Sequence, residues 1–443
     1  MLGTSRAALR VGVVGLGTAG TAAATLLSRQ GHDVTVYEKT PASAFSGPAQ
    51  NKLEGAVGAG IGLQPIGLTV LKHIGDDTLD EVLQKGARID HLHAVTRDGK
   101  TVLDLSYADF RPELHGVGLH RDVLFRVLMQ KAQEAGVQIV TDFDAQCVKA
   151  DSNGRGTFID GEGPFDLVIV ADGRNSIRKA IPGISSVEVP YPYGCLWTVL
   201  PDATGEWTSN NTLFQRLDSA KVMLGLLPTG HTMDALPGET PLVSLFWSLE
   251  MSSLAAVQER GLGAWKEVVM DLEPRTETLL EGLTSMDDLI PASYSDTFMP
   301  KYFSSELSTV FLGDSAHATS PQLGQGANLA LVDAWTLSNC IAEATRCRGG
   351  SGQTNREVVS SALAAYDHSR RWRLRFYQFN SKMLTPVFQS NSVVVGALRD
   401  LTMGSLCRFP PTRMQMLTVL CGAQNNGWPW STIPEDEFLG YTK

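Results

Sequence analysis

The clearest pattern of hydrophobic and polar positions lies close to the N-terminus. Residues 11–14 form a short apolar run dominated by valine, which is typical of a buried strand. A glycine-rich turn follows, and the alanine-rich segment at about 21–30 predicts a helix that ends at Gly31. A second apolar run at 34–37 ends at Glu38. The pattern predicts a β-α-β unit at the start of the chain.

Strand-like and helical segments then alternate up to about residue 170. A glycine-rich segment at 58–65 leads into an expected helix that ends near 73–75. Asp98-Gly99 is a strong hairpin signal between two short β-like runs. The runs of this hairpin lie at 88–93 and 101–107, a helix is expected at 122–135, and further strands are expected at 137–140 and 165–170. Such alternation is typical of a parallel sheet covered by helices.

The pattern changes between residues 190 and 247. Short β-like runs separated by Pro, Gly and Asp predict an antiparallel sheet, and hence a second domain. The runs lie at 196–200, 212–216, 222–227 and 242–247, followed by a helical segment at 254–283. After a strand at 309–312, two long helices are expected, the first to about 344 and the second at about 356–383. The remaining residues are expected to pack as a cap or an interface.

Composition narrows the class of protein. The chain has 443 residues, of which 43% are hydrophobic and 19% charged, as in a globular protein with a large core. A formal net charge of −10 without a long basic run argues against nucleic-acid binding. No stretch approaches the ~18 apolar residues of a membrane span, and the first residues lack the apolar core of a signal peptide. Six cysteines without CxxC spacing predict free thiols and no metal site. A cytoplasmic enzyme is expected.

The β-α-β unit carries the first candidate site. Gly15, Gly17 and Gly20 have the GxGxxG spacing, in which the glycines form a tight turn, admit a pyrophosphate and let helix and strand pack closely. The helix N-terminus offers free N–H groups to the phosphates. Glu38 follows at about the distance expected for the acid that binds ribose hydroxyls. The unit predicts a dinucleotide site, but by itself it does not separate FAD from NAD.

Two later motifs also follow strands. Asp172-Gly173 comes after the run at 165–170, where such a pair is often only a turn. Gly313-Asp314 comes after the run at 309–312 and precedes the glycine-rich start of a helix at 324–328. An acid at a strand end can hold a polyol, and a helix N-terminus can face an anionic ring. Arg121, at the start of an expected helix, is by position alone more often a solvated charge.

In this order, the segments resemble the FAD-dependent aromatic-ring hydroxylases, the single-component flavoprotein monooxygenases related to p-hydroxybenzoate hydroxylase. The similarity extends over residues 10–375, but in the middle sheet it is architectural only. The matching residues are Gly15, Gly17, Gly20 and Glu38; Asp172-Gly173 with Ser176 and Arg178; Gly313-Asp314, Ala316-His317, Pro321, Gly324, Gly326 and Asn328; and residues 60–65 with Arg121.

The resemblance implies FAD rather than NAD and a specific architecture. It implies a Rossmann-like FAD-binding domain with an inserted antiparallel-sheet substrate domain and a helical C-terminal segment. The expected boundaries are 1–80, 104–184 and 285–380 for the FAD-binding domain, 81–103 and 185–284 for the substrate domain, and 381–443 for the C-terminal cap or interface segment. The resemblance also implies NADH or NADPH as a transient co-substrate without a nucleotide fold of its own, and the chain has no second GxGxxG.

The resemblance also assigns site residues. Glu38 is expected to bind the adenosine ribose, Asp314 the ribityl chain, and the helix after Gly326 to lie under the flavin pyrimidine edge. The full expected FAD-binding set is Gly15, Gly17, Thr18, Ala19, Gly20, Glu38, Lys39, Arg121, Asp172, Gly173, Gly313, Asp314, Gly326, Ala327 and Asn328. The catalytic flavin-edge loop is expected to contain Pro321, Gly324, Gln325 and Gly326. Pocket candidates are Gln64 and four apolar residues of the middle sheet that are equally compatible with a core role, namely Trp197, Phe214, Met223 and Phe246.

Some features leave the mechanism open. The segment at 40–54 is longer than usual and replaces a common arginine, with Lys52 as the nearest substitute. No catalytic base is assigned, because His231, Tyr193 and Arg216 are each more often structural. The arginines at 370, 371, 373 and 375 are expected to be solvated or ion-paired rather than a binding site. The segment 428–434 is similar to a halogenase signature, but it has one residue too many and lies at the wrong end of the chain.

The expected function is therefore hydroxylation of an aromatic or otherwise electron-rich small molecule. The resemblance implies that NAD(P)H reduces FAD and that O₂ forms a flavin C4a-hydroperoxide, which delivers oxygen. The protein would act as a monomer or a homodimer. One alternative is a flavin oxidase or dehydrogenase with the same fold, and another is a flavin-bearing redox sensor without turnover.

Overall fold

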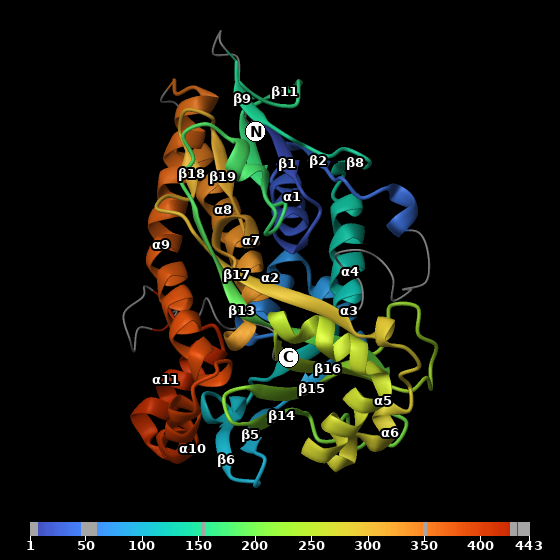
Figure 1. Ribbon diagram of the computed structural model, residues 1–443. Helices are drawn as coiled ribbons and strands as arrows, with labels where there is room; N and C mark the ends of the chain where they lie inside the picture. The colour runs from blue at the N-terminus through green and yellow to red at the C-terminus, as the bar shows by residue number, and fades with distance from the viewer. Residues whose placement is uncertain (1–7, 46–59, 152–155, 349–351, 426–431, 433–443) are drawn as a thin grey trace.

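A six-stranded sheet forms the centre of the first part of the molecule (Figure 1). The computed structural model describes residues 8–45, 60–151, 156–348, 352–425 and 432. All strands of this sheet are parallel except β18, which pairs antiparallel with β19. Their order is β18 (Phe303–Ser304), β19 (Thr309–Phe311), β12 (Leu167–Val170), β1 (Arg10–Val14), β2 (Asp33–Tyr37) and β8 (Gln138–Val140).

The central strands are apolar because both faces of the sheet are covered. Every residue of β12 is buried, and so are the last four residues of β1. The helices of this part are α1 (Thr18–Arg29), α2 (Pro65–Ile74), α3 (Asp76–Lys85), α4 (Arg121–Glu134), α8 (Gly326–Cys347) and α9 (Asn355–Phe388), of which α1 packs on β1 and β2. Helix α8 packs against both α1 and α9. The predicted alternation of strands and helices is confirmed, although α3 was not expected.

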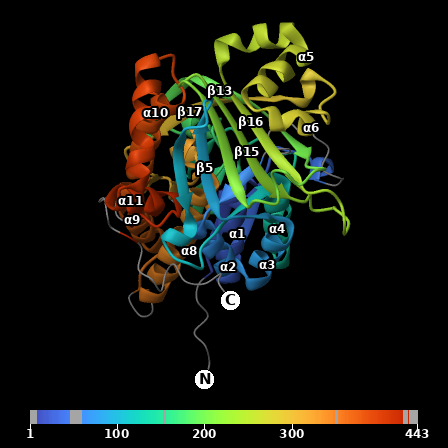
Figure 2. The same ribbon diagram turned by 90° about the horizontal axis from the view of Figure 1, so that it is seen from below.

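A seven-stranded sheet forms the second part of the molecule (Figure 2). Its order is β17 (Ile290–Phe298), β13 (Val187–Pro201), β16 (Leu242–Glu250), β15 (Val222–Gly230), β14 (Thr212–Asp218), β5 (His91–Thr96) and β6 (Thr101–Ser106). Neighbouring strands are antiparallel, except for the parallel pair β14–β5. Strand β17 and the end of β6 come from segments assigned above to the FAD-binding domain. The exact division into domains therefore stays a prediction.

The two faces of the seven-stranded sheet have different neighbours. Alternate residues of β13, β15 and β16, among them Leu196, Leu226 and Leu245, form a core with α5 (Leu254–Leu272) and α6 (Glu277–Leu280), and we call this the outer face. The inner face turns toward the first part of the molecule, where Ser244 and Thr229 lie against Gly60. Two small sheets complete the fold: β3 (Gly60–Leu63), β7 (Gly116–His120) and β4 (Ala87–Ile89), and β9 (Val148–Ala150), β10 (Thr157–Ile159) and β11 (Glu162–Phe165).

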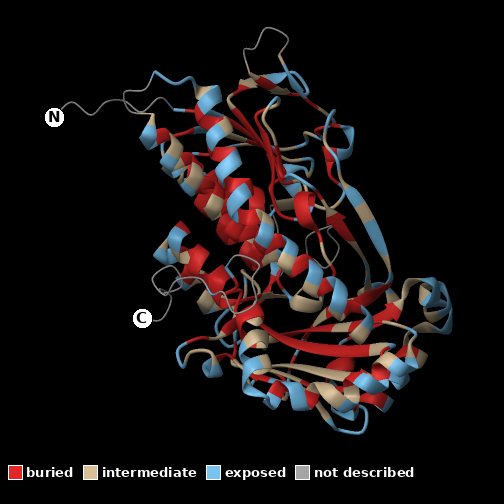
Figure 3. Ribbon diagram, turned by 90° about the vertical axis from the view of Figure 1, so that its left-hand side faces the viewer, coloured by how far each residue is buried: buried red, intermediate tan, exposed pale blue. Residues whose placement is uncertain are grey.

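The C-terminal residues form helices α10 (Val393–Arg408) and α11 (Pro410–Leu420), which lie beside the end of α9 (Figures 1 and 2). The buried residues concentrate in the strands of both large sheets and in the helices that pack on them (Figure 3). None of the helices in the described ranges combines the length and the apolar character that crossing a bilayer requires. All six cysteines are free thiols, as expected.

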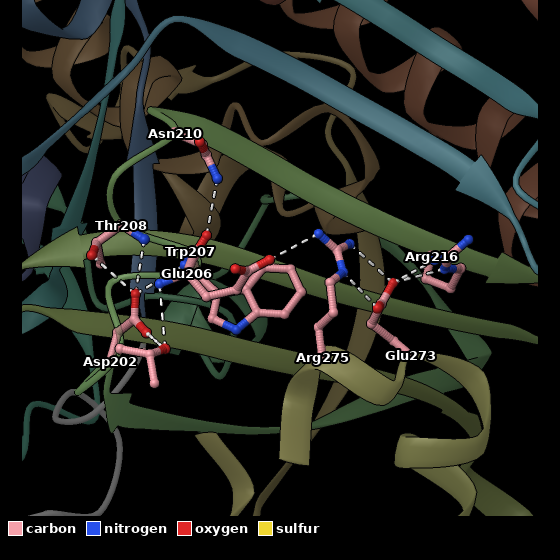
Figure 4. Close-up of polar contacts among 9 residues, drawn as sticks. Asp202, Glu206, Trp207, Thr208, Asn210, Arg216, Glu273 and Arg275 are labelled. Atoms are coloured by element: carbon pink, nitrogen blue, oxygen red, sulfur yellow. Dashed lines mark hydrogen bonds and ion pairs between the residues drawn. The ribbon is translucent and has the colours of Figure 1, made fainter. Parts of the chain in front are cut away.

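An ion-pair cluster fastens α5 and the turn after it to the outer face (Figure 4). Glu273 is 1% exposed and accepts hydrogen bonds from Arg216 at 2.6 and 2.9 Å and from Arg275 at 2.8 and 3.2 Å. The Arg275 guanidinium also lies 4.7 Å from the ring centre of Trp207 and 4.9 Å from that of Phe214. One buried carboxylate thus neutralises two cations that pack on aromatic rings.

Removing this carboxylate is expected to destabilise the protein. Glu273→Ala should lower the free energy of unfolding by about 3 kcal/mol, because a buried ion pair that loses one partner leaves the other charge uncompensated. Glu277→Ala, which removes an exposed carboxylate four residues away, should change it by less than about 0.5 kcal/mol. Urea denaturation of both variants measures the difference, and equal stabilities would contradict a stabilising role for the cluster.

The same carboxylate should make stability depend on pH. Burial raises the pKa of Glu273, but the hydrogen bonds and charges of Arg275 and Arg216 outweigh burial and lower this pKa below its usual 4.5. The stabilisation is then complete above about pH 4.5 and is lost as the pH falls through the lowered pKa. In the Glu273→Ala variant, denaturation curves between pH 6 and pH 3 should show a smaller loss of stability than in the unaltered protein.

Candidate functional site

The first glycine motif forms a turn that only glycine fits. Gly15 has a φ of +100°, and a Cβ there would lie 2.6 Å from the carbonyl oxygen of Ala171. A Cβ at Gly20 would lie 2.1 Å from the carbonyl oxygen of Gly15. Gly17 differs from both, because it is exposed and a Cβ there would have a single neighbour, at 3.9 Å. The close contacts bring the end of β1 against the end of β12 and leave Gly17 facing open space.

The N-terminus of α1 has no side chain that satisfies its backbone donors. Gly17 is the N-cap residue, and the first turn contains no acid. Thr18 is half-buried and Ala19 is buried. The first N–H groups of a helix lack intrahelical partners, so this end offers donors and a partial positive charge to an anion.

Glu38 lies at the end of β2, next to this turn. Its Oε2 accepts a hydrogen bond from the Leu16 N–H at 2.8 Å, and its Oε1 accepts two from Thr40, at 2.7 and 2.9 Å. The carboxylate is therefore fixed in orientation and, with its remaining lone pairs, can still accept bonds from hydroxyl groups. Lys39 and Arg121 are both exposed, Arg121 as the first residue of α4.

The third motif meets the first between two helices. Gly313 has a φ of +60°, and a Cβ there would lie 3.2 Å from the Cβ of Ala19 on α1 and 3.4 Å from that of Ala330 on α8. Asp314 begins the short helix α7 (Asp314–His317) and is exposed. Among the described residues, no side chain or backbone group hydrogen-bonds the Asp314 carboxylate, so this carboxylate can accept bonds from a ligand.

A buried carboxylate holds this loop in place. Asp333 on α8 is fully buried and accepts hydrogen bonds from the Gly313 N–H at 2.9 Å and from Arg370 at 2.7 Å, and it bonds His317 at 2.5 Å. Burial alone would raise the pKa of Asp333, but His317 and Arg370 hold it down at about 2. Arg370 is thus buried and ion-paired, whereas Arg375 is exposed. No motif around Asp333 marks it in advance as the common partner of these groups.

The second motif is joined to the third. Asp172 Oδ2 accepts a hydrogen bond from the Ile177 N–H at 2.7 Å, while its buried Oδ1 has no partner among the described residues. Burial raises the pKa of Asp172. Arg178, whose side chain is fully buried, pairs with Glu188 and donates a hydrogen bond to the Ser315 carbonyl oxygen at 3.0 Å. Gly173, with a φ of +80°, has open space around its Cβ position.

The loop before α8, residues 320–326, is joined to strand β3. Asn328 accepts a hydrogen bond from the Gln64 N–H at 2.8 Å and donates to the carbonyl oxygens of Gly62 and Gly324, both at 3.1 Å. Pro321, Gly324 and Gly326 are exposed, and Ala327 is half-buried. The amide of Asn328 therefore fixes the 320–326 loop against β3 and leaves the exposed residues free to face a ligand.

Gln325 turns away from the open side of this loop. It is 4% exposed, and its amide donates hydrogen bonds to the carbonyl oxygens of Val419 at 3.0 Å and Leu420 at 2.8 Å. The Ile66 N–H of α2 binds the neighbouring Cys421 carbonyl oxygen at 3.2 Å. The C-terminal end of α11 is thus attached to the loop. Sequence reasoning placed Gln325 at the flavin edge and missed this contact, because the partners lie 94 and 95 residues away.

The pocket candidates of the large sheet fall on two faces. Trp197 and Phe246 are directly paired on the inner face, and the Phe246 ring covers Gly225. Met223 is on the same face, where it packs with Phe246 and Phe388. Phe214 instead packs against the outer core beside Trp207 and Arg275. Phe214 therefore has the core role that the sequence also allowed, on the face opposite the other three candidates, because side chains alternate between the faces of a strand.

The remaining candidates have structural partners. Gln64 is buried and accepts a hydrogen bond from the Tyr107 hydroxyl at 2.5 Å. Of the three base candidates, Arg216 pairs with Glu273, Tyr193 donates to Asn391 at 2.8 Å, and His231 is half-buried. Lys52 lies outside the described residues, and so does the segment 428–434 except for Thr432, so those two interpretations stay predictions.

Sequence reasoning also missed a buried polar cluster next to Pro321. Asp296 is 1% exposed and accepts a hydrogen bond from the Tyr191 hydroxyl at 2.7 Å. Burial raises the pKa of Asp296 and is the main reason why the pKa of Tyr191 rises to about 12. The Ser320 hydroxyl, one residue before Pro321, bonds those of Ser381 and Thr385 at 2.8 and 2.7 Å. No motif marks these residues, which three separate elements bring together.

Comparisons with known proteins agree with this arrangement. A sequence model described as the FAD binding domain matches residues 8–372. The 3-amino-4-hydroxybenzoate 2-monooxygenase of Streptomyces cremeus is 29% identical over 348 residues, which are 75% of this chain and 78% of that protein. The 6-hydroxynicotinate 3-monooxygenase of Pseudomonas fluorescens is 25% identical over 386 residues, 82% of this chain and 88% of that protein.

Solved structures show the same fold. A mutant of 2-methyl-3-hydroxypyridine-5-carboxylic acid oxygenase superposes with a TM-score of 0.69 at 22% identity, over 95% of this chain and 100% of that one. PqsL of P. aeruginosa, in complex with 2-aminobenzoylacetate, superposes with a TM-score of 0.70 at 20% identity, over 88% and 99% of the two chains.

The family model covers most of the chain, and the three loops that carry its motifs meet around one place in the fold. The chain therefore belongs to the FAD-binding family of aromatic-ring hydroxylases related to p-hydroxybenzoate hydroxylase.

Proposed function

We propose that the chain is an FAD-dependent monooxygenase that uses NADH or NADPH and O₂ to hydroxylate a small aromatic or electron-rich molecule. The observation that carries this proposal is the convergence of three loops. Gly15 lies against Ala171, and Gly313 lies between α1 and α8. The proposal is supported by relatives whose names describe monooxygenases acting on hydroxylated aromatic rings.

The residues at this place fit FAD. The uncapped N-terminus of α1 would take the pyrophosphate, Glu38 the adenosine ribose, and the free carboxylate of Asp314 the ribityl chain. The partnerless buried oxygen of Asp172 lies on the loop beside Gly15 and offers one more acceptor. When bound, FAD would supply the hydride acceptor and the activation of O₂.

The chain's own contribution is position and charge. Helix α8 starts at Gly326 without a side-chain cap and without an acid in its first turn, so its N-terminus favours negative charge at the 320–326 loop. The Asn328 amide sets the distance between this loop and β3, and Gln325 attaches the loop to α11. The loop is thus held from both sides before any ligand binds.

The inner face of the large sheet would form the substrate side. Trp197 and Phe246 supply apolar surface that excludes water, which protects reactive species from wasteful breakdown. The indole N–H of Trp197 is buried without a partner among the described residues, and it can donate to a substrate oxygen.

A flavin oxidase or dehydrogenase would have the same fold, and the fate of oxygen distinguishes it from a monooxygenase.

Asp314 should contribute strongly to FAD affinity. Asp314→Ala should weaken FAD binding about 10- to 100-fold, because a hydrogen bond to a charged group contributes about 1.5–3 kcal/mol. Asp80→Ala, which removes an exposed carboxylate on α3, should leave the affinity unchanged. Fluorescence titration of the apoprotein with FAD measures both. Unaltered affinity in a folded Asp314→Ala variant would show that this carboxylate does not bind the cofactor.

Gln325 should act as a positioning residue. Gln325→Ala removes two hydrogen bonds that together contribute about 1–3 kcal/mol to the fixed loop, so more NAD(P)H should be consumed per product formed. Gln322→Ala is the matched control, since Gln322 lies in the same loop but bonds Gln389 instead. The ratio of H₂O₂ to product is the decisive readout, because lower stability alone does not change it. An equal ratio in both variants would refute the positioning role.

The fate of oxygen tests the reaction type. With ¹⁸O₂ and a true substrate, one labelled oxygen atom should appear in the product and little H₂O₂ should form. Without substrate, NAD(P)H oxidation should be slow and should end in H₂O₂. Mass spectrometry of the product together with a peroxide assay measures both quantities. Oxidation of the substrate without label, with one H₂O₂ per turnover, would establish an oxidase.

A further inference from the structure

The C-terminal helices carry an unusual concentration of exposed apolar side chains. Of the fifteen large hydrophobic residues that are exposed in the described ranges, ten lie between residues 372 and 414. We call these ten the C-terminal apolar face: Trp372, Phe379 and Met383 on α9, Val393, Val394, Leu398, Leu401 and Leu406 on α10, and Phe409 and Met414 around the start of α11. Soluble surfaces rarely gather so many such residues without a binding role.

The residues recur with helical spacing. Val394, Leu398 and Leu401 are four and three residues apart, so they lie on one side of α10. Their exposed fractions are 76%, 57% and 69%. Figures 1 and 2 place α10 and α11 beside the end of α9, along one flank of the molecule. This side of α10 therefore faces outward and packs on no other described element.

The charges of this region are almost all positive. Residues 368–425 contain eight Arg and Lys and a single acid, Asp400, in a chain whose net charge is −10. Asp400 is paired with the buried Arg399. Exposed cations are neighbours of the apolar residues in the sequence. Arg375 lies between Trp372 and Phe379, Lys382 precedes Met383, and Arg408 precedes Phe409. The exposed charges on these helices next to the apolar residues are therefore cationic, and the neighbouring exposed acids Asp104 and Asp109 lie at the edge, where Asp109 pairs with Arg413.

We propose that the C-terminal apolar face binds the surface of a membrane that contains anionic lipids. Aromatic and aliphatic side chains enter the boundary between headgroups and acyl chains, while Arg375, Lys382 and Arg408 reach lipid phosphates. The binding is peripheral, because no helix of the described residues could cross the bilayer. This inference does not depend on the proposed reaction.

Charge favours a lipid surface over a second copy of the chain. In a symmetric dimer the same patch meets itself, so these cations would face the same cations across the interface. An anionic lipid surface supplies both partners, hydrocarbon for the side chains and phosphate for the cations. The end of α9 also contacts the inner face, where Phe388 packs with Met223 and Phe246.

Vesicle flotation of the full, FAD-loaded chain tests the proposal. Phosphatidylcholine vesicles that contain phosphatidylglycerol should carry at least about ten times more protein than phosphatidylcholine alone, and added salt should reduce this binding. The double variant Leu398→Ser with Leu401→Ser should bind at least about tenfold less. The double variant Arg375→Gln with Lys382→Gln should lose the preference for anionic vesicles.

The control variant carries Leu236→Ser and Val268→Ser, two exposed apolar residues elsewhere that are 69% and 53% exposed. It should bind vesicles like the unaltered protein. The visible spectrum of FAD and the circular dichroism of each variant show that it is folded. Failure to bind either kind of vesicle would overturn the proposal, as would equal losses in the control. A dimer in sedimentation analysis that the Leu398/Leu401 variant converts to monomer would assign the face to a second copy.

Discussion

The fully buried carboxylate of Asp333 is the interaction on which the geometry of the site depends. It sits on α8 and binds the backbone of the Gly313 turn, His317 of α7 and Arg370 of α9. A charge in the interior is stable only when it is paired and hydrogen-bonded, so the three elements can adopt few relative positions. Asp314 immediately follows the turn, so the same hydrogen bonds fix its position relative to α8. The exposed acid that we propose as a cofactor ligand is thus placed by a buried acid on another helix.

Side chains alternate between the two faces of the large sheet, and the polar groups on the outer face differ from those on the inner face. On the outer face, the carboxylate of Glu273 neutralises two arginines that stack on aromatic rings, so these charged groups are paired. On the inner face, Trp197 keeps an indole donor without a partner among the described residues. Satisfied polar groups stabilise a domain, whereas unsatisfied ones are available to a ligand. The ion pairs of the outer face therefore serve folding, and we propose that the inner face serves recognition.

The sequence predicted the structure correctly where the chemistry of a single residue or a short run restricts the local backbone. Gly15 and Gly313 were recognisable because only glycine tolerates those dihedral angles and contacts, and local runs of valine identified β1 and β12. It was insufficient where partners are distant. Nothing in the sequence near Gln325 indicates that its amide bonds the Leu420 carbonyl oxygen. The sequence around Phe214 is equally compatible with either face of its strand. The parallel pairing of β14 with β5 likewise joins segments about 120 residues apart.

The bond between Gln325 and the end of α11 has a consequence for biosynthesis. The loop, α8 and both glycine turns are synthesised well before the carbonyl oxygens of Val419 and Leu420 exist. While a ribosome still holds those residues in its exit tunnel, the nascent chain can fold its first sheet but cannot fasten the 320–326 loop from the side of α11. The 320–326 loop is therefore among the last parts of the molecule to mature, although the first glycine motif is among the first to be made.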